Sequence, residues 1–176
     1  YVETVLTAAV AGYYLSQAAD GAVDRRLFAE ENGRMAAAVL TDAAATASQR
    51  DHALRTVTRW WKAREGGLSR RGLDGGPRGL LGDQLGLLEA LTAAGRIKEA
   101  LEVVAAVERE LLDAEKAAFY DRPASGELPA GLDRIRFAHL NARARRAYRI
   151  LGRAAKAPAV LKRVETLGDW LWNHPE

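Results

Sequence analysis

The sequence predicts an all-α protein of αα-hairpin repeats that form a partial α/α toroid. Alanine and leucine recur at periods of three and four, and alternation with period two is scarce. Short joints within the hairpins alternate with long connections rich in Gly, Pro and Arg. These observations predict about seven helices in the 176 residues, which suit a single helical domain or a fragment.

The predicted elements are a leading helix followed by three hairpins. Gly95 separates two helices of one hairpin, and Pro158 opens the last helix, where a first-turn proline is tolerated. The resulting boundaries are residues 1–20 for the leading helix, 31–66 for hairpin 1, 83–113 for hairpin 2 and 137–173 for hairpin 3.

The three hairpins resemble one another. Their first helices carry a polar residue near the start, at Asn32, Asp83 and Asn141, and their second helices share a Leu-x-x-Val-x-x-apolar pattern. A period near 50–60 residues is typical of stacked helical units. Because the connections between hairpins are long, an α/α toroid fits better than a solenoid with a period of about 34 residues.

Composition excludes several functions. The chain has no cysteine, so disulfides and thiolate sites are absent, and its three histidines follow no metal-ligand spacing. We therefore predict no metal and no cofactor. The net charge of +3 is small, and Arg143, Arg146, Arg149 and Arg153 follow helical spacing, which we interpret as a solvated face. This argues against nucleic acid as a partner.

No apolar run reaches the roughly 20 residues that cross a bilayer, and no signal peptide is recognisable. We expect a soluble protein without a membrane partner and favour a cytoplasmic location. The chain begins at Tyr1, already in helical pattern, so we expect a fragment. A missing upstream domain, another protein chain or a second copy would then cover its exposed apolar ends.

The glycine-rich stretch GLDGGPRGLLGDQLGLLEAL, residues 72–91, does not match a phosphate-binding loop. It lacks the G-x-x-x-x-G-K-[ST] pattern, whose lysine and hydroxyl contact phosphate and Mg²⁺. We interpret it as an inter-hairpin loop that leads Asp83 to the start of a helix.

Three segments resemble the helical region of the large thioredoxin-domain-containing proteins of the spermatogenesis-associated type. They are DRRLFAEENGRMAAAVL, LLGDQLGLLEALTAAG with the later FYDRP, and HLNARARRAYRILGR, spread over about residues 15–173. The resemblance implies the later part of a toroid related to six-hairpin glycosidases. In that family a thioredoxin-like domain precedes the toroid. Glu31 stands here where the family often has Trp.

Seven residues are candidates for a ligand cleft at the loop-rich face. The acids matter most because glycoside hydrolysis needs two carboxyl groups roughly 5–10 Å apart. We favour helix capping over catalysis for Asp83, because an Asp at a helix start accepts free backbone N–H groups, and we assign no catalytic residue. The candidates are Glu31, Asn32, Asp74, Asp83, Gln84, Asp121 and Asn141.

Two functions remain open from the sequence. In the first, the chain is a non-catalytic toroid fragment that docks a domain or binds a protein or a carbohydrate-like ligand. In the second, it is a sugar-processing enzyme of the glycosidase or epimerase type with Asp83 as acid or base.

Overall fold

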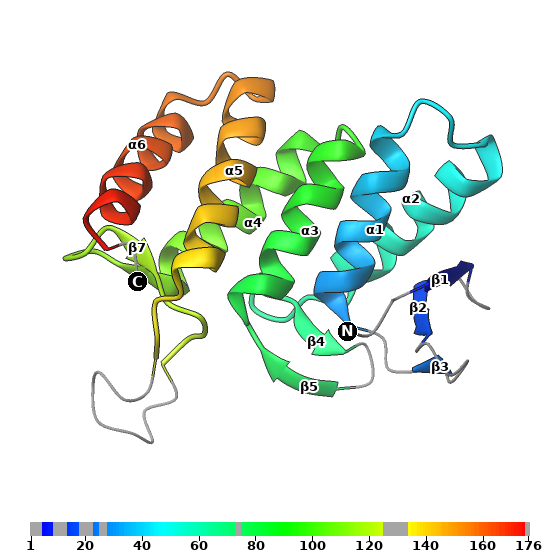
Figure 1. Cartoon of the computed structure of the whole chain (residues 1–176), viewed down its shortest axis with the longest axis horizontal. Helices are drawn as coiled ribbons and strands as arrows, with labels where there is room; N and C mark the ends of the chain where they lie inside the picture. Colours follow the sequence, from blue (N-terminus) through cyan, green and yellow to red (C-terminus); the bar gives the residue numbers. More distant parts are fainter. Residues whose placement is uncertain are drawn as a thin grey trace.

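Six helices form three hairpins arranged in a curved row (Figure 1). The structure, a computed structural model, describes residues 5–8, 14–17, 23–24, 28–72, 75–124 and 134–174. The helices are α1 (Ala29–Thr41) and α2 (Ala47–Lys62), α3 (Leu81–Ala93) and α4 (Ile97–Leu111), and α5 (Ala138–Ala154) and α6 (Pro158–Asn173). The all-α fold class and its hairpin repeat are thus confirmed, and each predicted hairpin contains one helix pair.

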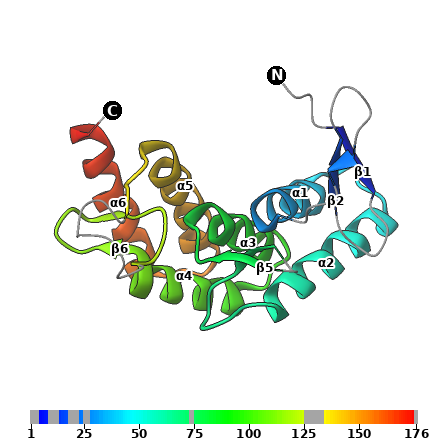
Figure 2. The ribbon, with the colours of Figure 1, turned by 90° about the horizontal axis from the view of Figure 1, so that it is seen from below.

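The row is bent, so that its two sides differ. Helices α1, α3 and α5 lie along the inner side of the curve, and α2 and α4 lie on the outer side (Figure 2). The joints within hairpins lie at one edge, while the connections between hairpins lie at the opposite edge, beside the N-terminal ends of α1, α3 and α5 (Figure 1). This is the arrangement that the alternation of short and long connections predicts.

The helix boundaries follow local chemistry. Thr46 and Gln49 form a capping box at the start of α2: the Thr46 hydroxyl accepts from the Gln49 N–H at 3.3 Å, and the Gln49 side chain accepts from the Thr46 N–H at 2.7 Å. Pro158 occupies the first turn of α6, as predicted. Gly95 ends the α3 side of its joint with a φ of +71°, which favours glycine.

Short strands stand where helices or plain loops were expected. Strands β1 (Val5–Ala8), β2 (Tyr14–Gln17) and β3 (Val23–Asp24) form an antiparallel sheet, so the predicted leading helix within residues 1–20 is wrong. The physical reason is that Val5, Thr7 and Tyr14 are residue types that favour strands. The inter-hairpin connections contain the antiparallel pairs β4 (Arg70–Gly72) with β5 (Gly75–Arg78), and β6 (Leu112–Asp113) with β7 (Ala118–Phe119).

Helix α3 lies at the centre of the hydrophobic core. Most of its residues are buried, including Leu81, Leu85, Leu88 and Leu91, each 0% exposed. Helix α1 crosses α3 closely at two glycines: a Cβ added at Gly33 would lie 2.3 Å from the carbonyl carbon of Gly86. Because Gly33 and Gly86 lack side chains, the first turns of α1 and α3 come close together. These turns carry Glu30 and Asp83.

Candidate functional site

A buried amide side chain occupies the fourth position of each inner helix. These amides belong to Asn32, Gln84 and Asn141, at most 2% exposed. Each amide nitrogen donates to the backbone carbonyl just before its helix, with distances of 2.9 Å for Asn32 to Phe28, 3.2 Å for Gln84 to Leu80 and 3.1 Å for Asn141 to Phe137.

Two of these amides also hold the segment that leads into the hairpin. The Gln84 amide accepts from the Ser69 N–H at 2.8 Å and donates to the Ser69 carbonyl at 3.1 Å. The Asn141 amide forms the same pair with Phe119, at 2.7 and 2.9 Å. Gln84 and Asn141 therefore hold the connections that lead into their hairpins, and the prediction of Asn32, Gln84 and Asn141 as cleft residues is not confirmed by the lining of the cleft.

This geometry corrects the alignment of the repeats by one residue. Gln84, and not Asp83, is the equivalent of Asn32 and Asn141. The sequence signal is the run Phe-Ala-x-x-Asn, which occurs at residues 28–32 and again at 137–141. In the middle hairpin the run becomes Leu-Leu-Gly-Asp-Gln, residues 80–84, so the longer Gln takes the place of Asn and the match is obscured.

Asp83 caps a helix, but not its own. Its Oδ1 accepts from the backbone N–H of Glu30, in the first turn of the neighbouring helix α1, at 3.2 Å. Helix α3 begins at Leu81 without a side-chain cap, so the predicted capping of α3 by Asp83 is wrong. The close crossing at Gly33 and Gly86 explains why Asp83 caps α1, because it places the Asp83 carboxylate against a first-turn N–H of that helix.

The second oxygen of Asp83 is the unusual group of this region. Asp83 is 2% exposed, and its Oδ2 is buried and has no hydrogen-bond partner among the described residues. Burial raises the pKa of Asp83 to about 7, while Arg71 and the Glu30 N–H favour the charged form and the Glu30 and Glu31 carboxylates oppose it. A carboxyl group near neutrality in a cleft is typical of functional sites.

Asp83 lines a cleft of about 380 Å³ on the loop-rich side of the inner helices. First-turn residues of α1, α3 and α5 meet there, so three helix N-termini contribute to it. The lining residues are Glu30, Arg34, Arg71, Leu80, Gly82, Asp83, Asp121, Phe137, His139, Leu140 and Arg143.

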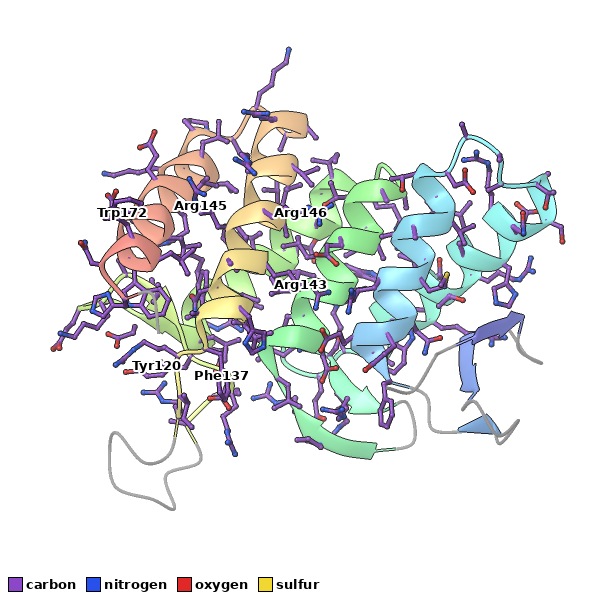
Figure 3. All side chains as sticks on the ribbon, in the orientation of Figure 1. Tyr120, Phe137, Arg143, Arg145, Arg146 and Trp172 are labelled. Atoms are coloured by element: carbon purple, nitrogen blue, oxygen red, sulfur yellow. The ribbon has the colours of Figure 1, made fainter. Side chains whose placement is uncertain are left out.

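Arg143 joins the three inner helices beside the cleft. Its guanidinium forms a bidentate pair with Glu89 of α3, at 3.0 and 2.8 Å, and an ion pair with Glu30 of α1. Figure 3 shows Arg143 on the side of α5 that faces α3. The predicted solvated arginine face is therefore only partly right: Arg146, Arg149 and Arg153 are exposed, whereas Arg143 is a partly buried bridge.

The remaining predicted residues differ in whether they line the cleft. Asp121 lines the cleft, but its carboxylate accepts from the Ile135 N–H at 2.8 Å and pairs with Arg122 at 3.1 Å. Glu31 is exposed and does not line the cleft. Asp74 lies outside the described residues. Sequence reasoning missed Glu30, and it missed Arg34, Arg71, His139 and Arg143 as cleft residues, because neighbouring hairpins supply them together.

Within the described part of the chain, no three metal-binding side chains gather into a possible ion site. None of the helices in that part is long and apolar enough to cross a membrane.

Comparison with known proteins identifies the fold. No family profile matches the chain, and no curated protein has a similar sequence. Among solved structures, the GH76 α-mannanase of Bacteroides thetaiotaomicron, determined as a selenomethionine derivative, superimposes with a TM-score of 0.69 at 14% sequence identity. The match covers 96% of this chain and 51% of the mannanase chain. The fold is therefore that of the six-hairpin glycosidase-like toroids, and this chain spans about half the length of the matched structure.

Proposed function

We propose that this chain is a non-catalytic half of a six-hairpin toroid whose cleft binds a carbohydrate-like ligand. The observation that carries the proposal is the buried Oδ2 of Asp83, which has no partner in the described part of the chain and belongs to a residue lining the cleft. An unsatisfied buried oxygen costs about 1–3 kcal/mol, and a ligand hydroxyl would satisfy it. The mannanase fold supports a sugar-sized, hydroxyl-rich ligand by analogy.

The state of the other acids favours binding over hydrolysis. Paired-carboxylate hydrolysis needs a second acid that is free to act as base or nucleophile. Glu30 is held by Arg143, and both oxygens of Asp121 are engaged, by the Ile135 N–H and by Arg122. The described lining of the cleft thus offers Asp83 no free carboxylate partner.

A sugar-processing enzyme of the glycosidase or epimerase type is the second candidate. The pKa of about 7 favours it, because a carboxyl group that holds its proton near neutrality can act as a general acid. This candidate predicts turnover of an oligosaccharide that Asp83→Asn abolishes while binding persists. The non-catalytic proposal predicts binding without release of reducing ends.

The test is the melting temperature of the chain in the presence of mono- and oligosaccharides. A ligand at ten times its Kd should raise Tm by about 3–6 °C. Asp83→Ala should abolish this rise, whereas the exposed Asp169, on α6 and outside the cleft lining, provides a control as Asp169→Ala. The proposal fails if no sugar stabilises the chain, or if Asp83→Ala responds like the wild type.

We infer further that the half-toroid is the helical region of a thioredoxin-domain-containing protein of the spermatogenesis-associated type. The support is the resemblance of residues 15–173 together with the match to half of a toroid. A domain of that longer protein, or a second copy of this chain, would then be the partner at the open ends of the row. The coding sequence tests this inference: an adjoining thioredoxin-like domain supports it, and an unrelated adjoining domain contradicts it.

A further inference from the structure

Two of the three arginines that line the cleft form no ion pair within the described part of the chain. Arg143 is neutralised by Glu30 and Glu89. The two without an ion pair in that part are Arg34 and Arg71; the guanidinium carbon of Arg71 lies 4.8 Å from the ring centre of Phe28, and its charge also favours the ionised form of Asp83. An arginine without a carboxylate partner retains its full capacity for bidentate pairing with an anion.

The cleft lining contains three acids beside its three arginines, and two of these acids are engaged in ion pairs. Glu30 and Asp121 are paired with Arg143 and Arg122. Asp83 has its pKa raised to about 7 by burial, so it is about half protonated at neutral pH. The three arginines of the lining are therefore balanced by Glu30, Asp121 and Asp83 when Asp83 is ionised, and one positive charge remains when Asp83 is protonated.

The helix N-termini at the cleft also favour an anion. First-turn residues of three inner helices line the cleft, namely Glu30 of α1, Asp83 of α3 and His139 of α5. Each helix N-terminus carries a partial positive charge of roughly half a unit. The ring of His139 lies 5.5 Å from that of Phe137, centroid to centroid, so the same cleft also offers ring faces to an apolar sugar face.

We propose that the ligand of this cleft is an anionic carbohydrate, a sugar that bears a carboxylate or phosphate group, with Arg34 and Arg71 binding the anion and Asp83 binding a hydroxyl. This inference rests on the proposed function and narrows its ligand class. The carboxylate and phosphate forms share the chemistry of a charged oxygen group that two guanidinium groups can pair with.

The experiment is calorimetric titration of the chain with matched ligands: glucose, glucuronate and glucose 6-phosphate, with acetate and inorganic phosphate as anions without a sugar. We expect glucuronate or glucose 6-phosphate to bind at least about ten-fold more tightly than glucose, since hydrogen bonds to charged groups contribute roughly 1.5–3 kcal/mol. Whichever anionic sugar binds more tightly identifies the charged group. Binding should weaken as salt rises, because the two arginines are exposed to screening.

Variants separate this inference from the proposed function. Arg34→Gln and Arg71→Gln should each remove about ten-fold of the preference for the charged sugar, and Arg55→Gln, the same charge change at an exposed position of outer helix α2, should leave it intact. Equal binding of neutral and charged sugars, unchanged by the arginine variants, would overturn the inference and leave the proposed function standing. Inorganic phosphate or acetate binding as tightly as the sugar would reduce the cleft to an anion site and overturn the sugar assignment. Failure of every sugar to bind would overturn both.

Discussion

Asp83 accepts its hydrogen bond from the helix beside its own, and burial at this contact between helices raises its pKa. One oxygen satisfies the Glu30 N–H, and the other is left buried without a partner in the described part of the chain. Capping was predictable from an Asp near a helix start, but the identity of the capped helix was not. It depends on a crossing between residues more than 50 positions apart in the sequence.

The raised pKa of Asp83 predicts that stability falls as pH rises. In the unfolded chain this carboxyl loses its proton near pH 4, whereas in the folded chain it holds the proton to about pH 7, so the folded state binds more protons between these values. The stabilisation is complete below about pH 4 and is lost as pH rises through 7. It amounts to about 4 kcal/mol at most.

Chemical unfolding of the wild type and of Asp83→Asn at pH values from about 5 to about 8, on both sides of the Asp83 pKa of about 7, measures this effect. Asn can still accept from the Glu30 N–H but carries no charge. We expect the difference in unfolding free energy to grow in favour of Asp83→Asn as pH rises. Parallel pH profiles of the two proteins would show that Asp83 has an ordinary pKa.

At the scale of elements, the helices could be predicted and their partners could not. The periodicity of apolar residues placed six of the helices, because most of them bury one apolar stripe regardless of what covers it, while α3 is apolar on nearly every side. The strands β1 and β2 were missed because the alanines around their strand-favouring residues match a helical period. The repeat of buried amides could be predicted only in part. The run Phe-Ala-x-x-Asn begins at Phe28 and again at Phe137, but the third copy has Gln84 in place of Asn and does not match the run.

The α1–α3 crossing predicts a strong asymmetry between two glycine substitutions. A Cβ at Gly33 would overlap the backbone of Gly86 at 2.3 Å, which no rotamer change can relieve, so Gly33→Ala should destabilise the fold by about 2–3 kcal/mol or more. A Cβ at Gly168 of α6 would meet the end of the flexible Arg145 side chain at 3.0 Å.

Gly168→Ala is the matched control for that substitution. Helix propensity favours alanine by about 1 kcal/mol, which offsets the displacement of Arg145, so the net change should stay within about 1 kcal/mol. Denaturant unfolding of both variants measures the two values. Similar losses for Gly33→Ala and Gly168→Ala would contradict the close crossing that brings Glu30 and Asp83 together.

At the scale of the whole molecule, three stacked hairpins form a curved half of a toroid with its loop-rich edge on one side. The fold class followed from the sequence because it needs only helix periodicity and loop lengths. The cleft did not follow, since its lining draws one or a few residues from each inner helix and from β4. Of the predicted residues that the structure describes, Asp83 and Asp121 line it. That Arg34 and Arg71 form no ion pair in this part of the chain emerges only when the partners of the other groups are known.

Two tryptophans near the end of the row differ in exposure. Trp172 near the end of α6 is 87% exposed, while Trp170, two residues earlier, is 7% exposed and packs in the interior. Figure 3 places Trp172 at the outer edge of α6. An exposed tryptophan of this size is typical of a surface that another hairpin or chain covers. This surface is separate from the cleft, so docking there would leave Asp83 and its neighbours open to a ligand.

The most direct measurement of the central claim is the set of backbone amide NMR shifts on addition of a sugar that stabilises the chain. A ligand in the cleft should shift the amides of Glu30, Gly82, Asp83 and His139, which lie in the first turns of three different helices and line the same cleft. The amides near Trp172 should stay unchanged. Shifts confined to α6, or no shifts at saturating ligand, would contradict the assignment of this cleft as the binding site.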